Sequence, residues 1–135
     1  MQTAMAERDA NALGAERPVT GGLLDLGHLD HQTLGDTTLR REVLQLFLSE
    51  VPKIVADLKQ ANDVRAWRMA LHTIKGVALN LGAFQLARQC RHFEQSEGAD
   101  VQSQRYDAAR AIATLVDETR TAINSLLGEG STPRV

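Results

Sequence analysis

The stretch Trp67–Ala83, WRMALHTIKGVALNLGA, decides the fold because it carries the clearest helical pattern of the chain. At about 100° per residue, a helix over this stretch gathers its large apolar side chains into one stripe, and such a stripe must be buried. The stripe consists of Trp67, Leu71, Ile74, Ala78 and Leu81, and it is widened by Ala70 and Val77. The opposite face carries Arg65, Arg68, His72, Lys75, Gly76 and Leu79. The pattern predicts an amphipathic helix on which His72 points toward solvent.

Gly76 is unexpected inside this helix, because an internal glycine costs roughly 1 kcal/mol against alanine and the apolar period continues beyond it. It lies one turn after His72, where a missing side chain leaves space over the imidazole for a bulky group to approach. Lys75 and Arg68 flank the same ring, so the expected visitor is an anion. An exposed imidazole with open space beside it and cations around it is what a phosphorylatable histidine requires.

Each of these features also has an ordinary explanation. Surface histidines are commonly inert, a helix glycine can serve close packing, and outward Arg and Lys side chains usually only meet solvent. The combination is less common. By composition alone, a His with Lys at +3 and Gly at +4 occurs in roughly one chain in a hundred of this size. The coincidence favours phosphoryl chemistry.

A longer motif surrounds the histidine. It starts with His72-Thr73-Ile74-Lys75-Gly76 and continues with Ala78, Asn80, Leu81, Gly82 and Ala83. This motif resembles the signature of histidine phosphotransfer (HPt) domains, the carriers of multistep phosphorelays. The resemblance extends from about Leu24 to Leu127 through the order and spacing of the helices. The sequence departs from the pattern at Val77, where many members have a small or hydroxyl residue, and at Leu71, where alanine is common. Neither departure touches the chemistry.

Composition narrows the class of protein. The 135 residues suit one domain with a real core, and a net charge of −2 gives no basic surface for nucleic acid. The single cysteine, Cys90, cannot form an internal disulfide, which suits a reducing cytoplasm. The N-terminal residues lack the apolar core of a signal peptide, and no apolar run is long enough to span a membrane. We expect a cytoplasmic protein that binds neither nucleic acid nor membrane.

Three parts are expected along the chain: a mobile tail over residues 1–22, a helical domain over 23–127 and a flexible tail over 128–135. Besides the central helix, helices are expected over 38–60, 83–97 and 103–127, and a short helix or an irregular cover is expected over 23–34. Their apolar positions are Leu39, Val43, Leu44, Phe47, Val51, Ile54, Val55 and Leu58, then Leu86, Ala87, Cys90 and Phe93, and finally Tyr106, Ala109, Ile112, Val116, Ile123 and Leu127. With no alternating strand pattern, the helices predict an all-α fold, an antiparallel four-helix bundle with a short extra N-terminal helix.

Polar residues and glycines mark the expected helix ends. Asp36 is placed to cap the second helix, and Asn62 or Asp63 the central one. Gly98 and Gly128 are expected to end the last two helices. Within the second helix, Pro52 removes a backbone hydrogen bond and should bend the helix near Leu48.

A neutral imidazole attacks through the nitrogen that lacks a proton, so an efficient phosphoacceptor needs its other nitrogen held by a partner. Glu94 is the candidate, because it lies one turn after Cys90 at the edge of an apolar stripe and can lean toward the central helix. Some HPt domains place the orienting residue at this spacing of 22 residues. We expect Glu94 to accept from Nδ1 of His72 and leave Nε2 free. Alternatively, Glu94 is a surface acid or pairs with Arg88 or Arg91.

The remaining site residues follow from the outward face of the central helix. Lys75 and Arg68 are expected to bind the phosphoryl oxygens, and Gly76 supplies clearance. A partner-docking surface is expected around His72 and should be small, since a relay partner has to leave again. Its candidate contacts are Arg65, Leu79 and Ala83, with Leu34 as a further one.

No metal site or nucleotide site is expected. His28 and His31 lie three residues apart but lack a third ligand at convincing spacing, and inward Glu-x-x-His pairs are absent. The chain has no Walker A motif, no glycine-rich phosphate loop after a strand and no acidic cluster for Mg²⁺. We therefore expect a phosphoryl carrier without a kinase site.

The HPt resemblance implies the partners. They are response-regulator receiver domains that present a phosphorylated aspartate and its Mg²⁺, with a hybrid histidine kinase as a further candidate. The carrier would exchange the phosphoryl group reversibly with two receivers, acting as a monomer. The main alternative is a helical interaction module without phosphotransfer activity. The dimerisation helices of a histidine kinase are disfavoured, because Thr73 rather than an acid follows the histidine and no ATP-binding domain comes later.

Overall fold

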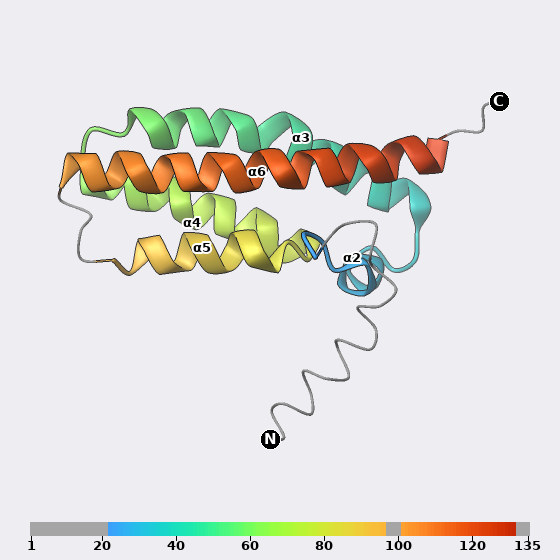
Figure 1. Cartoon of the computed structure of the whole chain (residues 1–135). Coiled ribbons are helices and arrows are strands. Elements are labelled where there is room, and N and C mark those ends of the chain that lie inside the picture. The colour runs from blue at the N-terminus through green and yellow to red at the C-terminus, as the bar shows by residue number, and fades with distance from the viewer. Residues whose placement is uncertain (1–21, 97–100, 132–135) are drawn as a thin grey trace, which may run out of the picture.

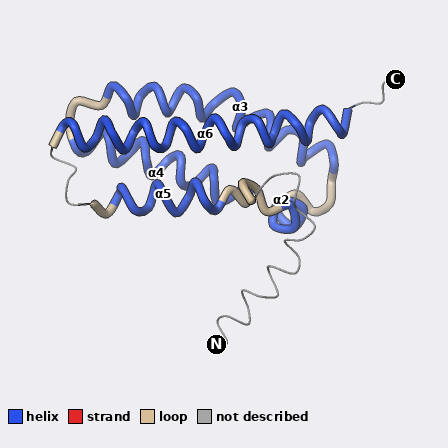
Figure 2. The backbone as a smooth tube through the Cα atoms, viewed as in Figure 1, coloured by secondary structure: helices blue, strands red, loops and turns tan. Residues whose placement is uncertain are grey.

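The computed structural model describes residues 22–96 and 101–131. These residues contain only helices and loops (Figure 2). The helices are α2 (Leu26–Gln32), α3 (Thr37–Gln60), α4 (Val64–Leu81), α5 (Phe84–Glu94) and α6 (Gln102–Ser131). Among the four longer helices, α4, α5 and α6 each run antiparallel to the helix before them (Figure 1). The expected four-helix bundle with a short extra N-terminal helix is confirmed.

The helices form two layers, in which α3 lies beside α6 and α4 lies beside α5. Helix α3 also packs on α4, and α2 covers the end of the bundle where α4 meets α5. A bundle of this kind needs only short connections, because every helix starts where the previous one ends. The arrangement leaves one side of α4 and α5 open to solvent, and this side carries His72.

Aspartates cap three of the helices. Asp25 accepts from the backbone of α2, Asp36 from that of α3, and Asp63 from Ala66 N at 2.8 Å in α4. Each carboxylate satisfies amide groups that have no partner within the first helical turn. Asp63, rather than Asn62, therefore starts the helix that carries the site. Helix α3 continues through Pro52 without interruption.

Some expected helix limits were wrong. Helix α5 ends at Glu94 rather than residue 97, and α2 begins three residues later than expected. Gly128 does not end α6, which continues to Ser131. A glycine stops a helix when it takes a left-handed conformation, and Gly128 lacks the positive φ that Gly82 has. Residues 128–131, expected in the C-terminal tail, therefore belong to α6. The rest of the expected tails, at 1–21 and 132–135, and Gly98 lie outside the described residues.

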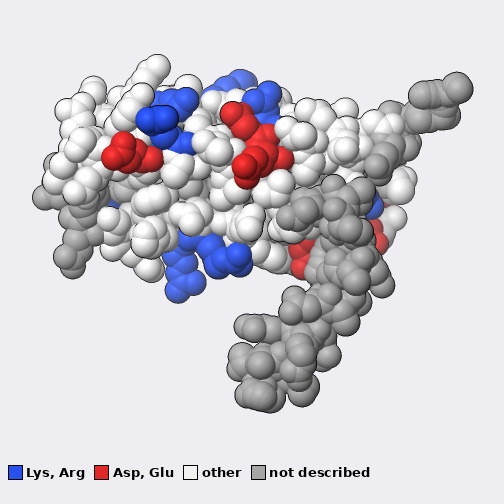
Figure 3. Space-filling model, in the orientation of Figure 1, with Lys and Arg blue, Asp and Glu red and all other residues white. Residues whose placement is uncertain are grey.

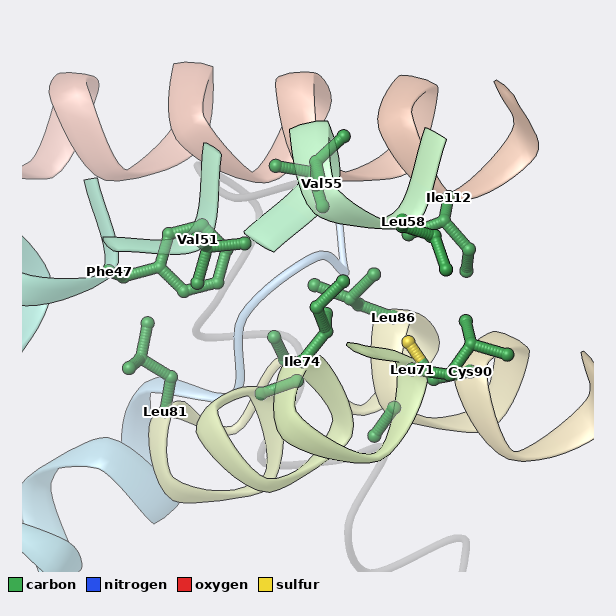
Figure 4. Close-up of a cluster of buried hydrophobic side chains, with 14 of the residues drawn as sticks. Phe47, Val51, Val55, Leu58, Leu71, Ile74, Leu81, Leu86, Cys90 and Ile112 are labelled. Carbon is green, nitrogen blue, oxygen red and sulfur yellow. The ribbon is translucent and has the colours of Figure 1, made fainter. Parts of the chain in front are cut away.

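The core lies between the two layers (Figure 4). Its largest buried side chains come from every helix, and burial of each contributes about 1.5–3 kcal/mol. They are Trp67, Phe47, Leu24, Leu29, Leu44, Leu58, Leu71, Ile74, Leu81, Leu86, Ile112 and Ile123. Trp67 also donates from Nε1 to the Arg105 carbonyl, 3.3 Å away, and so joins α4 to α6.

The prediction that Tyr106 and Leu39 lie in the core is wrong, because these residues are 54% and 36% exposed. Along α6 the buried stripe runs through Arg105, Ala109 and Ile112, at spacings of four and three residues. Tyr106 lies about 100° around the helix from Arg105 and faces outward. The Nη2 of the buried Arg105 donates to the Asn62 carbonyl at 3.5 Å. Among the described residues, no helix is long and apolar enough to cross a membrane.

Candidate functional site

The two faces of α4 differ as its sequence indicates. Trp67, Ala70, Leu71, Ile74, Ala78 and Leu81 are all buried. His72 lies on the other face, and its side chain is 68% exposed. Val77 is half-buried at the border between the faces. The packing of α4 on α3 and α5 therefore fixes the direction in which the imidazole points, because a rotation of the helix would expose its apolar stripe.

Gly76 lies in open space. A Cβ built at this position would have no described atom within 4 Å beyond its own helix backbone and chain neighbours. Close packing therefore does not explain this glycine. Because side chains four residues apart are neighbours on a helix, the open space borders the imidazole of His72.

Glu94 lies beside the histidine. Its Oε2 is 3.1 Å from Nδ1 of His72, and α5 supplies it from the neighbouring position in the bundle. An ionised carboxylate can only accept a hydrogen bond, so Nδ1 carries the proton in this contact. The lone pair of the ring then lies on Nε2. Within the described ranges, no ion pair joins Glu94 to Arg88 or Arg91, so the alternative pairings of this acid are not formed.

Lys75 completes a three-residue cluster with His72 and Glu94. Its Nζ lies 2.8 Å from Glu94 Oε1, so each carboxylate oxygen faces a different partner. Burial raises the pKa of the Glu94 carboxyl, but hydrogen bonds and charge from Lys75 and His72 outweigh it and lower the pKa below 4.5. Glu94 is therefore ionised at neutral pH and available as an acceptor.

Cys90 lies beneath this cluster in the core. Burial raises the pKa of its thiol to about 12, the negative charge of Glu94 adds to the rise, and Lys75 opposes it. The thiolate is the reactive form of cysteine, so Cys90 is inert at neutral pH and serves packing.

Arg68 lies one turn before His72 but is engaged elsewhere. Its Nε donates to the Glu94 carbonyl at 3.1 Å, and its Nη2 donates to the Ser96 carbonyl at 3.2 Å. These bonds direct the guanidinium to the end of α5. Arg65, Arg68, Met69 and His72 border one shallow hollow together with Val64.

The prediction that Ala83 contacts a partner is wrong, because this residue is fully buried. It lies immediately before α5, and the left-handed turn at Gly82 directs it into the core. Leu79 is 44% exposed and Leu34 is 86% exposed, so both are accessible. Met69, which is 57% exposed, was missed as a candidate contact. Its position three residues before His72 was the available signal.

A second hollow was also missed. It has a volume of about 390 Å³, lies between α4 and α5, and shares Lys75 with the histidine cluster. Its other lining residues are Leu79, Phe84, Ala87, Arg88 and Arg91. Figure 3 shows Lys and Arg side chains projecting from the edge of the molecule below α5. The sequence contains Arg88 and Arg91, but it does not show that they lie beside the end of α4, because that depends on how α5 packs on α4.

Among the described residues, no group of three or more His, Cys, Asp and Glu side chains could hold a metal ion. His28, one of the two histidines considered for a metal, bonds through Nε2 to the Leu79 carbonyl at 2.9 Å. Its ring also packs edge-on against Phe84, with centroids 5.0 Å apart. His28 thus attaches α2 to the joint between α4 and α5.

Comparison with known proteins agrees with this geometry. The family model of the Hpt domain matches residues 42–124, which is more than half of the chain. The chain therefore belongs to the Hpt domain family. Members of this family are phosphocarriers rather than kinases, and they perform histidine phosphotransfer in two-component signalling with receiver domains and kinases. Searches among curated proteins and solved structures gave no match.

Proposed function

We propose that this protein is a cytoplasmic carrier that moves a phosphoryl group between receiver-domain aspartates through Nε2 of His72, in a multistep phosphorelay. The observation that carries the proposal is the contact between Nδ1 of His72 and Glu94 on an imidazole that is 68% exposed. The contact holds the proton on the inner nitrogen, so the outer nitrogen has the lone pair that attacks phosphorus.

The transfer step balances with these groups. The Nε2 lone pair forms a bond to phosphorus while the bond from phosphorus to the aspartate oxygen breaks, and the carboxylate leaves with that electron pair. The ring then carries a positive charge, which the Glu94 carboxylate stabilises through the Nδ1 proton. The reverse reaction follows the same path. Mg²⁺ is expected on the receiver, which holds the phosphorylated aspartate.

Lys75 and Gly76 support the phosphoryl group in this proposal. Lys75 is within reach of both Glu94 and the space beside His72. Its positive charge offsets the negative charge of the phosphoryl oxygens. Gly76 leaves the open space that the incoming group requires. The protein itself mainly positions the nucleophile, as is usual for phosphoryl transfer.

The receiver would dock on the surface around His72. Met69 and Leu79 supply exposed apolar contacts before and after the histidine, and Arg65 lies at one end. The hollow lined by Arg88 and Arg91 extends this surface toward α5. Its positive charges fit an acidic edge of the partner and would steer its approach.

Phosphorylation by a labelled receiver tests the proposal. We expect acid-labile, base-stable label on the wild-type protein and none on His72→Gln. His31→Gln is the matched control, because it removes an exposed histidine from α2 instead. Label on His72→Gln would contradict the proposal. Absence of label on the wild type with every receiver of the source organism would favour the interaction module without phosphotransfer.

A further arm of this experiment tests docking. Leu79→Asp should slow transfer from the receiver by about tenfold, which corresponds to the loss of a modest apolar contact of about 1.4 kcal/mol. Phosphorylation by phosphoramidate, a small donor that needs no docking surface, should stay at the wild-type rate. An unchanged rate with the receiver would remove Leu79 from the docking surface. A fall in both rates would show that the substitution disturbs His72 itself.

A further inference from the structure

Three side chains on one stripe of α4 converge on Glu94. Arg68 Nε binds its backbone carbonyl at 3.1 Å, and His72 Nδ1 binds Oε2 at 3.1 Å. Lys75 Nζ lies 2.8 Å from Oε1. Positions 68, 72 and 75 lie on the same helix face, at spacings of four and three residues. One residue of α5 is therefore held at its main chain and at both carboxylate oxygens by a single face of α4.

Glu94 occupies a weak position in its own helix. It is the last residue of α5, and the last carbonyls of a helix have no partner within the helix. The following residue, Gln95, has φ −95°, so the helix lacks the left-handed glycine turn that closes α4. Arg68 supplies donors from the neighbouring helix, to the carbonyls of Glu94 and Ser96. A cation at this end also compensates the partial negative charge of the helix C-terminus.

We propose that Arg68 is a positioning residue that sets the tautomer of His72 through Glu94. By holding the end of α5 against α4, it keeps the carboxylate within reach of Nδ1 and so keeps the lone pair on Nε2. This role differs from the direct contact with phosphoryl oxygens that the sequence suggests. The effect on transfer rate rests on the proposed function, whereas the effect on the tautomer does not.

The geometry favours positioning over direct phosphate contact. Both bonds of Arg68 use the edge of the planar guanidinium formed by Nε and Nη2, which is one of the two edges through which an arginine can bind a phosphoryl group in a bidentate manner. The bonds direct the guanidinium toward the end of α5, so the edge that they occupy is not available to a phosphoryl group on His72. A lysine at this position would lack the planar fork that aims two donors at two carbonyls, so it would reproduce these bonds only in part.

Nitrogen NMR of the His72 ring in the unphosphorylated protein gives the direct test, since it distinguishes the two neutral tautomers. We expect the wild type to hold the proton on Nδ1. Arg68→Ala should populate the tautomer with the proton on Nε2, and Arg68→Lys should restore the wild-type state in part. Arg110→Ala is the control, because it removes an exposed arginine from α6. An unchanged tautomer in folded Arg68→Ala would overturn the proposal.

A double-mutant cycle separates positioning from phosphate binding. Arg68→Ala should slow transfer by about tenfold, the size of one lost charged hydrogen bond. If Arg68 acts through Glu94, the Arg68→Ala, Glu94→Ala protein should be no slower than Glu94→Ala alone. Additive losses would overturn the proposal and assign Arg68 to the phosphoryl group or the partner. A wild type that accepts no phosphoryl group would contradict the proposed function, while the ring spectrum would still decide the role of Arg68.

Discussion

Two glycines of the same helix region, Gly76 and Gly82, have opposite surroundings. A Cβ at Gly76 would meet no described atom within 4 Å, whereas a Cβ at Gly82 would lie 2.8 Å from the backbone oxygen of Asp25. Gly82 also has φ +80°, a conformation that L side chains rarely adopt. The bundle therefore requires Gly82 but not Gly76. Packing does not explain Gly76, and its place one turn from an exposed histidine fits the clearance that the proposed function assigns to it.

Of the two glycines, Gly82 should show the larger effect on stability when it is substituted. Gly82→Ala should lower the free energy of unfolding by about 2–4 kcal/mol, because the left-handed conformation costs about 1–2 kcal/mol and the methyl group would meet main chain that cannot rotate away. Urea unfolding followed by circular dichroism measures the loss. The protein that remains folded should still accept a phosphoryl group. A loss below 1 kcal/mol would show that the joint relaxes and would weaken the contrast.

Gly76 should respond in the opposite direction. Gly76→Ala should raise the free energy of unfolding by about 1 kcal/mol, because alanine favours the helix and nothing obstructs its methyl group. Gly76→Leu should remain folded and yet slow transfer from a receiver, since its side chain fills the space beside His72. Transfer at the wild-type rate by Gly76→Leu would show that the clearance has no role in the reaction.

The charge cluster around His72 should have the smallest effect on stability. The folded pKa of Glu94 is lowered from 4.5, so its ionised form stabilises the protein above that pH, and the contribution is lost as pH falls through the folded pKa. Glu94→Gln should therefore be less stable than the wild type at pH 7, by less than about 1 kcal/mol because the cluster is partly solvated. Urea unfolding at pH values from 7 to below 4.5 should show the difference shrinking. A difference independent of pH would mean that packing, not charge, is responsible.

Apolar periodicity predicted most of the fold. The apolar stripes of α3, α4 and α5 predicted which faces of these helices are buried. The apolar period of α4 alone predicted that His72 faces solvent and that Trp67 lies in the core. On α6 the polar Arg105 interrupts the apolar pattern, so the neighbouring Tyr106 was assigned to the core in its place. Arg105 donates from Nη2 to the Asn62 carbonyl, which is a contact between residues far apart in the sequence that periodicity does not contain.

In the candidate site, too, some features could be predicted from the sequence and others could not. The position of Glu94 beside His72 was predictable, because it depends on a fixed spacing and on the edge of an apolar stripe. The burial of Ala83 was not, since it depends on the direction that the chain takes after Gly82. The contacts of Arg68 were also beyond the sequence. A long flexible side chain can reach several partners, and where α5 ends decides which one it meets.

Trp67, the only tryptophan of the chain, lies in the core of the helix that carries His72. Its indole nitrogen donates to a carbonyl of α6, so its fluorescence depends on the contact between these two helices. Emission therefore provides a label-free signal from the core of the bundle, on the face of α4 opposite His72. A variant that loses phosphoryl transfer but keeps the Trp67 emission has lost the reaction or the binding of its partner. A variant in which both the transfer and the emission change has lost the packing of α4 against α6.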